Sequence, residues 1–228
     1  MKDWSISFAG CGFMGIYYLG AISCILERFP RFIEGASKIY GCSAGALMAA
    51  ILTLGIPLGE CLVSSLLPKD VPFKNYTGNK QILPEDAHVR ASGRLCVSLT
   101  RVPDGKNLIV SEFSSRNDLI EVYFTHLPCP QRYVDGAASD NLPRCNENNT
   151  VTFSAYAGES DICPRGSILN FHEVRFNNVS IQVNSENVYR VTSTFFPPAP
   201  EAMAEICNSG YMDALRFLKE NSKNIICL

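Results

Sequence analysis

Lys38-Ile39-Tyr40-Gly41-Cys42-Ser43-Ala44-Gly45-Ala46-Leu47-Met48 contains a β-prone segment, a turn of small residues and the start of a run of strong helix formers. Strand, turn and helix around a Gly-x-Ser-x-Gly pentapeptide are typical of a nucleophile elbow, whose strained backbone makes the serine hydroxyl protrude. Gly41, Cys42, Ala44 and Gly45 form the predicted elbow around Ser43. The pattern predicts a nucleophilic serine at residue 43, and an ordinary turn is the alternative.

A second glycine motif, Gly10-Cys11-Gly12-Phe13-Met14-Gly15, follows a strand-like segment at residues 4–9. Its Gly-x-Gly-x-x-Gly spacing also fits a dinucleotide-binding loop, which needs an acidic residue at the end of the next strand. That strand ends at Tyr40-Gly41-Cys42-Ser43 without one. The alternative is an oxyanion hole built from the backbone N–H groups of Gly10, Cys11, Gly12, Phe13, Met14 and Gly15.

A third motif, Asp135-Gly136-Ala137, places a carboxylate before two small residues. Asp-Gly is a common turn signal, so a loop carboxylate is the simpler interpretation. A Ser-Asp-His chain order would need a histidine after the acid, and only His172 lies there, because His88 and His126 come earlier. His172 lies in a strand-like stretch without flanking glycines, where a lone histidine is more often structural.

These three motifs, in this order, resemble the patatin-like phospholipase family, in the branch of adipose triglyceride lipase and adiponutrin. The resemblance spans nearly the whole chain. It is carried by the segments 6–18, 91–95, 98–102, 139–143, 158–164 and 210–218.

The resemblance implies an α/β fold, a three-layer sandwich with a mostly parallel central sheet and helices on both faces. It also implies that Ser43 is the nucleophile and Asp135 its base, in a Ser-Asp dyad that needs no histidine, metal or cofactor. A carboxylate is a weak base for a serine proton, so we expect a desolvated Asp135 and a short hydrogen bond to Ser43.

The implied activity is that of a carboxylic ester hydrolase, similar to triacylglycerol lipase, which cleaves acylglycerol esters in lipid catabolism. An alcohol in place of water would give transacylase activity. The alternative is a catalytically weak or inactive module that binds lipid and regulates other proteins. The implied partners are an acylglycerol or other lipid ester, a lipid droplet or membrane surface and a lipase co-activator protein. The implied location is cytoplasmic, with peripheral attachment to droplets or membranes.

The chain departs from that branch in two places, where it is predicted to be shortened: near residues 66–83 and residues 123–132. The second segment directly precedes Asp135. We therefore expect the site to be more open than in the relatives, or Asp135 to be displaced. A misplacement of about 1 Å can lower the rate about 10²-fold.

Length and composition predict a single domain over residues 1–228. The net charge of −2 gives no reason to expect nucleic-acid binding, and 46% hydrophobic residues support a sizeable core. None of the ten cysteines forms a Cys-x-x-Cys pair, which indicates buried thiols in a reducing cytosol rather than a metal or disulfide framework. No signal peptide is evident, and the longest apolar stretch, near residues 44–56, is too short to span a bilayer.

The order of predicted elements favours α/β. Asp104-Gly105 indicates a hairpin between the two middle strands, so part of the sheet should be antiparallel. The apolar stripe of Met203, Ile206, Leu215 and Leu218 in the last helix indicates core packing. Strands are predicted at 4–9, 37–42, 94–100, 107–111, 132–134 and 150–154, and helices at 14–27, 44–54, 115–123 and 200–220.

Overall fold

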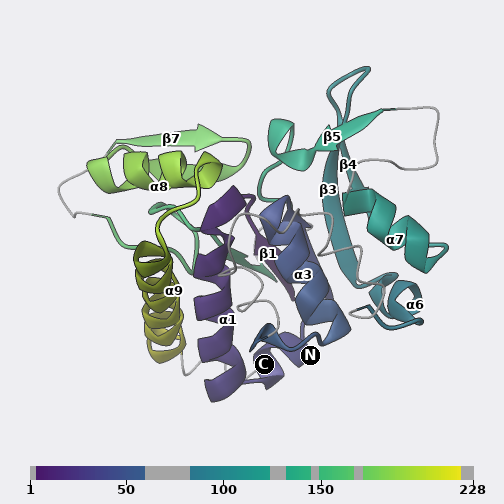
Figure 1. The fold of residues 1–228 in the computed structure, drawn as a ribbon, viewed down its shortest axis with the longest axis horizontal. Helices are drawn as coiled ribbons and strands as arrows, with labels where there is room; N and C mark the ends of the chain where they lie inside the picture. The colour runs from purple at the N-terminus through teal and green to yellow at the C-terminus, as the bar shows by residue number, and fades with distance from the viewer. Residues whose placement is uncertain (1–3, 60–82, 124–131, 145–148, 167–171, 222–228) are drawn as a thin grey trace.

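The computed structural model describes residues 4–59, 83–123, 132–144, 149–166 and 172–221. A central sheet of six strands is flanked by helices (Figure 1). This arrangement confirms the predicted α/β class with a mostly parallel sheet. The two segments predicted to be shortened lie almost wholly outside the described residues.

The central sheet has the strand order β4-β3-β2-β1-β6, and β5 also pairs with β3. The neighbours β6, β1, β2 and β3 run parallel, whereas β4 and β5 are antiparallel to β3. The predicted hairpin at Asp104-Gly105 is therefore confirmed. The strand bounds are Ser5–Phe8 (β1), Lys38–Cys42 (β2), Leu95–Arg101 (β3), Asn107–Val110 (β4), Tyr133–Asp135 (β5) and Thr150–Phe153 (β6).

The four predicted helices are present, with small shifts at their ends. The first begins at Ile16 rather than residue 14, because Gly12–Gly15 forms a separate 3₁₀ helix, η1. The four helices are α1 (Ile16–Arg28), α3 (Ala44–Leu54), α7 (Arg116–Tyr123) and α9 (Pro200–Glu220). Four further helical segments were not predicted from the sequence: α2 (Arg31–Glu34), α6 (Ala87–Ala91), α8 (Ser185–Phe195) and the 3₁₀ helix η2 (Gly136–Ala138).

A small second sheet lies beside α8 (Figure 1). It is an antiparallel hairpin of β7 (Glu173–Phe176) and β8 (Val179–Gln182). Asn177 and Asn178, at its turn, have positive φ angles of 43° and 71°. Asparagine tolerates this left-handed conformation better than most residues, which explains the tight two-residue turn.

Helices α1 and α9 run side by side and pack at backbone contact (Figure 1). A Cβ atom on Gly20 would lie less than 3.0 Å from the carbonyl oxygen of Cys207, and one on Gly210 would lie equally close to the carbonyl oxygen of Tyr17. The apolar stripe of α9 packs against the core, as predicted. Only glycine allows the two helices to approach this closely.

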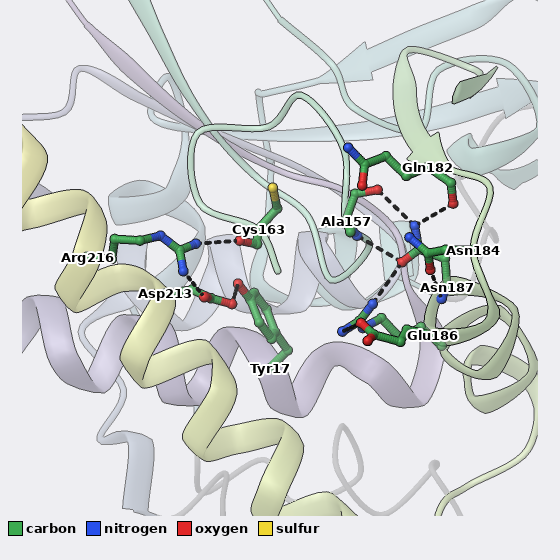
Figure 2. A network of polar contacts seen from close by, with 10 residues as sticks. Tyr17, Ala157, Cys163, Gln182, Asn184, Glu186, Asn187, Asp213 and Arg216 are labelled. Carbon is green, nitrogen blue, oxygen red and sulfur yellow. Dashed lines mark hydrogen bonds and ion pairs between the residues drawn. The ribbon is translucent and has the colours of Figure 1, made fainter. Parts of the chain in front are cut away.

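A buried polar cluster braces the same two helices (Figure 2). Asp213 of α9 accepts a hydrogen bond of 2.8 Å from the Tyr17 hydroxyl of α1 and one of 2.7 Å from the Arg216 guanidinium. Arg216 also donates to the carbonyl oxygen of Cys163 at 3.0 Å. Burial of a carboxylate is unfavourable without such partners, so the cluster fixes how α9 lies on α1.

Candidate active site

The predicted elbow has the backbone geometry that its motif requires. Ser43 has φ 51° and ψ −126°, a conformation that L-residues rarely adopt and that typically costs about 1–3 kcal/mol. A Cβ atom on Gly41 would overlap the backbone of Gly45, and one on Gly45 would lie 2.6 Å from the carbonyl oxygen of Ala9. The two glycines therefore allow β1, β2 and α3 to meet at backbone contact around Ser43.

Ser43 lies directly before α3 and is half-buried. Its hydroxyl makes no capping hydrogen bond, and no described residue is its partner. The N–H groups of Ala44 and Gly45, at the first positions of α3, donate to no acceptor among the described residues. A helix N-terminus also favours negative charge at this position.

The order of pairing along β3 brings Asp135 to Cys42, the residue before Ser43. Leu99 and Thr100 of β3 pair with β4 on one edge and with β5 on the other. That second edge is occupied by β2 up to the pair of Cys42 and Ser98. Strand β5 therefore begins pairing where β2 ends, and Asp135 lies beside the residue that precedes Ser43.

A hydrogen bond confirms this proximity: the Cys42 thiol donates to Asp135 Oδ1 at 3.3 Å. The backbone N–H of Ala137 donates to the same oxygen at 2.9 Å. Asp135 Oδ2 has no partner among the described residues, and no hydrogen bond joins the carboxylate to Ser43 Oγ there. The expected desolvation of Asp135 by protein is wrong, because its side chain is exposed.

The Cys42 thiol acts as a donor because it stays protonated. Burial raises the pKa of this thiol far above its ordinary value of 9.0, and the neighbouring negative charge of Asp135 raises it further. The thiol side chain is wholly buried. One carboxylate oxygen is thus held in place, and the other is left for a second partner.

The backbone of Asp135 rests on a polar group that the sequence analysis missed. Thr100 Oγ1 donates to the Asp135 carbonyl oxygen at 2.9 Å and lies 2.7 Å from Ser139 Oγ, and Asn107 Nδ2 donates to Ser139 Oγ at 3.0 Å. A Cβ atom on Gly136 would overlap the backbone of Ser98. This contact explains why small residues follow the aspartate.

The glycine loop lies against the elbow. A Cβ atom on Gly10 would lie 3.1 Å from Ser43 Cβ, and one on Gly15 would lie 3.3 Å from Ala44 Cβ. Gly12 has a positive φ of 52°, and a Cβ atom there would overlap the carbonyl group of Thr194 in α8. The loop is therefore fixed between α3 and α8.

The backbone N–H groups of the glycine loop differ in whether they already donate a hydrogen bond. Gly10 N–H already donates to Asn141, to the carbonyl oxygen at 3.2 Å and to Oδ1 at 3.0 Å, and Met14 N–H donates to the Cys11 carbonyl at 3.0 Å. The prediction that Gly10 and Met14 supply free donors therefore does not fit the geometry. Within the described part of the chain, the N–H groups of Cys11, Gly12 and Phe13 donate to no acceptor, so these three remain candidate donors.

Two of the three histidines lie in the described part of the chain, and neither His88 nor His172 forms a hydrogen bond with Ser43 or Asp135 there. No group of three His, Cys, Asp or Glu side chains suited to a metal ion occurs among the described residues. No helix of the described segments is both long and apolar enough to cross a membrane.

We expect the free energy of unfolding to fall as pH rises above about 9, and denaturant titrations from pH 8 to pH 10 will measure this. Burial raises the pKa of the Cys11 thiol from 9.0 to about 12. Above pH 9 the thiol ionises in the unfolded chain but stays protonated in the folded protein, so rising pH favours the unfolded chain. The free energy of unfolding therefore falls by about 1.4 kcal/mol per pH unit for this one thiol between pH 9 and pH 12. Cys11→Ala should flatten the slope, and an equally steep slope in that variant would contradict the assignment.

The segment that contains the glycine loop and the elbow matches a known protein family. Residues 6–109 match the family model described as patatin-like phospholipase. The matched region includes the glycine loop and the elbow but ends before Asp135.

Three curated relatives illustrate the similarity along nearly the whole chain. Human "Patatin-like phospholipase domain-containing protein 2" is 44% identical over 247 residues, covering 96% of this chain and 49% of the relative. Mouse "1-acylglycerol-3-phosphate O-acyltransferase Pnpla3" is 39% identical, covering 96% and 60%. Human "Patatin-like phospholipase domain-containing protein 5" is 37% identical, covering 95% and 57%. The chain spans about half the length of the curated relatives it matches.

Proposed function

Because the chain belongs to the patatin-like phospholipase family, we propose that it is a serine acyl hydrolase for lipid esters that uses Ser43 and Asp135 as a dyad. The observation that carries the proposal is the hydrogen bond from Cys42 to Asp135 Oδ1, which sets the carboxylate beside a serine in a strained elbow. Oδ2 of Asp135 has no described partner and is the oxygen that would receive the serine proton.

In the proposed reaction, Ser43 Oγ forms a bond to the acyl carbonyl carbon while its proton passes to Asp135. The carbonyl oxygen becomes an oxyanion, which the free amides of Gly12, Phe13 and Ala44 would bind. The alcohol then leaves with the proton from Asp135. Water attacks the acyl-enzyme, gives one proton to Asp135, and releases the fatty acid as Ser43 Oγ takes that proton back.

Because Asp135 is exposed in the protein alone, we infer that the bound substrate removes water from its carboxylate. An acyl chain lying over the elbow would exclude water from the carboxylate, and exclusion of water strengthens the interaction between Ser43 and Asp135. Under this proposal the dyad becomes effective only when a long apolar substrate is bound.

The proposed substrates are acylglycerols, with triacylglycerol as the first candidate and a lipid alcohol as a second acceptor for the acyl group. The acceptor is suggested by the printed name of the mouse relative, an acyltransferase for 1-acylglycerol-3-phosphate. Hydrolysis and transfer share one acyl-enzyme and differ in whether water or an alcohol attacks it.

A fluorophosphonate probe tests the proposed nucleophile, because only an activated serine displaces its fluoride. We expect stoichiometric labelling at Ser43 and release of fatty acid from a triacylglycerol emulsion. Folded protein that is neither labelled nor active would favour the second candidate, a lipid-binding regulatory module. The absence of a described hydrogen bond between Ser43 and Asp135 is the observation that keeps this candidate open.

We also propose that the protein acts at a lipid droplet or membrane surface, attached from the cytoplasm. Exposed aromatic residues lie next to the site: Phe13 in the glycine loop is 52% exposed, and Phe195 and Phe196, at the end of α8, are 71% and 69% exposed. Thr194, the neighbour of Phe195, contacts Gly12. A lipase co-activator protein remains a prediction from the resemblance.

Replacing Phe195 and Phe196 by serine should weaken binding to a triacylglycerol emulsion about tenfold or more, since each buried phenylalanine contributes about 1.5–3 kcal/mol. Hydrolysis of a soluble short-chain ester should stay unchanged. Flotation with the emulsion measures binding. Val89→Ser is the control, because Val89 is 67% exposed on α6, at the opposite end of the molecule (Figure 1). Equal flotation of both variants would contradict the prediction.

A further inference from the structure

Asn141 lies in the loop that follows the Asp135 turn, and its side chain is only 5% exposed. Its amide contacts Gly10 from both sides: Gly10 N–H donates to Oδ1 at 3.0 Å, and Nδ2 donates to the Gly10 carbonyl oxygen at 3.3 Å. Gly10 N–H also lies 3.2 Å from the Asn141 carbonyl oxygen. One residue thus holds both polar groups of the peptide at the start of the glycine loop.

Gly10 is also tightly enclosed between Asn141 and the elbow. A Cβ atom on Gly10 would lie 2.5 Å from Asn141 Oδ1 and 3.1 Å from Ser43 Cβ. The contact with Asn141 therefore sets the separation between the glycine loop and Ser43. Since the loop continues into Gly12 and Phe13, any shift of Gly10 would move their free amides relative to Ser43.

Asn141 is itself fixed from the side of the aspartate. Its backbone N–H donates to the Asn177 carbonyl oxygen at 2.9 Å, in the turn of the β7–β8 hairpin. Asn177 Nδ2 donates to the carbonyl oxygen of Ala137 at 2.6 Å. Ala137 N–H in turn holds Asp135 Oδ1. These hydrogen bonds form a continuous path from Asp135 through the hairpin turn to Gly10.

We propose that Asn141 is a positioning residue, which holds the glycine loop against the elbow so that the Gly12 and Phe13 amides face the oxyanion. The inference rests on the proposed function. Asparagine suits the role because its short side chain carries both a donor and an acceptor without charge. Aspartate would keep an acceptor for Gly10 N–H but would lose the donor and would place negative charge near the developing oxyanion.

The test compares two variants at Asn141 with a matched control. Asn187 is 2% exposed and holds Ala157 in the same way, accepting from its N–H at 2.9 Å and donating to its carbonyl oxygen at 2.9 Å (Figure 2). Asn187→Ala therefore removes an equivalent buried amide outside the path described above. The readouts are the rate of fluorophosphonate labelling, kcat and KM for a soluble ester, and the denaturant midpoint.

We expect Asn141→Ala to slow labelling and kcat about 10²-fold with little change in KM, as for a misplacement near 1 Å. Asn141→Asp, which preserves the volume and one hydrogen bond, should lose at least as much kcat. Asn187→Ala should lower the midpoint while labelling stays within about threefold of the unmodified protein.

If folded Asn141→Ala or Asn141→Asp protein is labelled at Ser43 at the original rate, the positioning role of Asn141 is overturned, while the proposed function stands. A loss in Asn187→Ala equal to that in Asn141→Ala would do the same, because the effect would then be one of general stability. If the folded unmodified protein is not labelled at Ser43, the proposed function fails, and the role of Asn141 fails with it.

Discussion

Ser43→Ala is expected to abolish hydrolysis of lipid esters, with kcat lower by a factor on the order of 10⁴ to 10⁶, as when other serine hydrolases lose their nucleophile. Alanine keeps the small side chain that the elbow accommodates but has no oxygen to form the acyl-enzyme. Release of fatty acid from an emulsion and fluorophosphonate labelling measure the loss. Both signals should vanish together, since both require the same Oγ atom.

Asp135→Asn should lower kcat about 10²- to 10⁴-fold, the usual contribution of a general base. The amide can still occupy the position between Cys42 and Ala137, so the turn should keep its shape while losing its ability to take the proton. Unfolding midpoints close to that of the original protein would show that the fold is intact.

Two further variants serve as controls for this pair. Ser23→Ala removes a hydroxyl that bonds within α1, and Asp104→Asn removes a surface carboxylate that pairs with Arg101. Both should retain full activity. Substantial turnover in Ser43→Ala or Asp135→Asn would contradict the dyad, and a loss in the controls would show that the assay reports stability instead.

Gly210→Ala is expected to destabilise the protein, although alanine in a helix interior normally stabilises it by about 0.5–1 kcal/mol over glycine. The new methyl group would overlap the carbonyl oxygen of Tyr17 and push α9 away from α1. Overpacking of this kind costs about 1–3 kcal/mol and sometimes more. Urea denaturation should show the lower midpoint directly.

The corresponding substitution on α1, Gly20→Ala, should also destabilise the protein, because the new methyl group would overlap the carbonyl oxygen of Cys207. Gly59 provides the comparison, since a Cβ atom there would meet no atom of the described residues within 4 Å. Gly59→Ala should leave the midpoint unchanged or raise it slightly. An unchanged midpoint in Gly210→Ala would show that the helices can separate without loss of packing.

The sequence predicts those parts of the fold that have a local signal. Short β-prone segments and runs of strong helix formers predict the six central strands and four helices to within a few residues. Helix α8 was missed because Val188, Val191, Thr192 and Thr194 are β-branched and disfavour helices. Its start is marked by a capping hydrogen bond of 2.7 Å from Asn187 N–H to Asn184 Oδ1. The stretch around His172 reads as strand-like, but strand β7 (Glu173–Phe176) was not predicted, because it is only four residues long and exposed along its whole length.

At the candidate active site, the sequence predicts the main site residues but not the tertiary contacts between them. Ser43, Asp135 and the glycine loop each follow a short motif, so they could be identified in advance. The contacts of Asn141 with Gly10 and of Cys42 with Asp135 join residues 131 and 93 positions apart. No local pattern encodes such pairs, and the exposure of Asp135 depends on the tertiary structure in the same way.

The pairing of β5 with β3 has a consequence for how this site tolerates changes in chain length. Asp135 is placed by its ladder partner Leu99, not by the length of chain that leads to it. Residues can therefore be gained or lost before Tyr133 without moving the carboxylate, provided that the register is kept. A slip by one residue would instead turn Asp135 to the opposite face of the sheet. The pairing with β3 thus fixes the position of Asp135 independently of the length of the segment that precedes Tyr133.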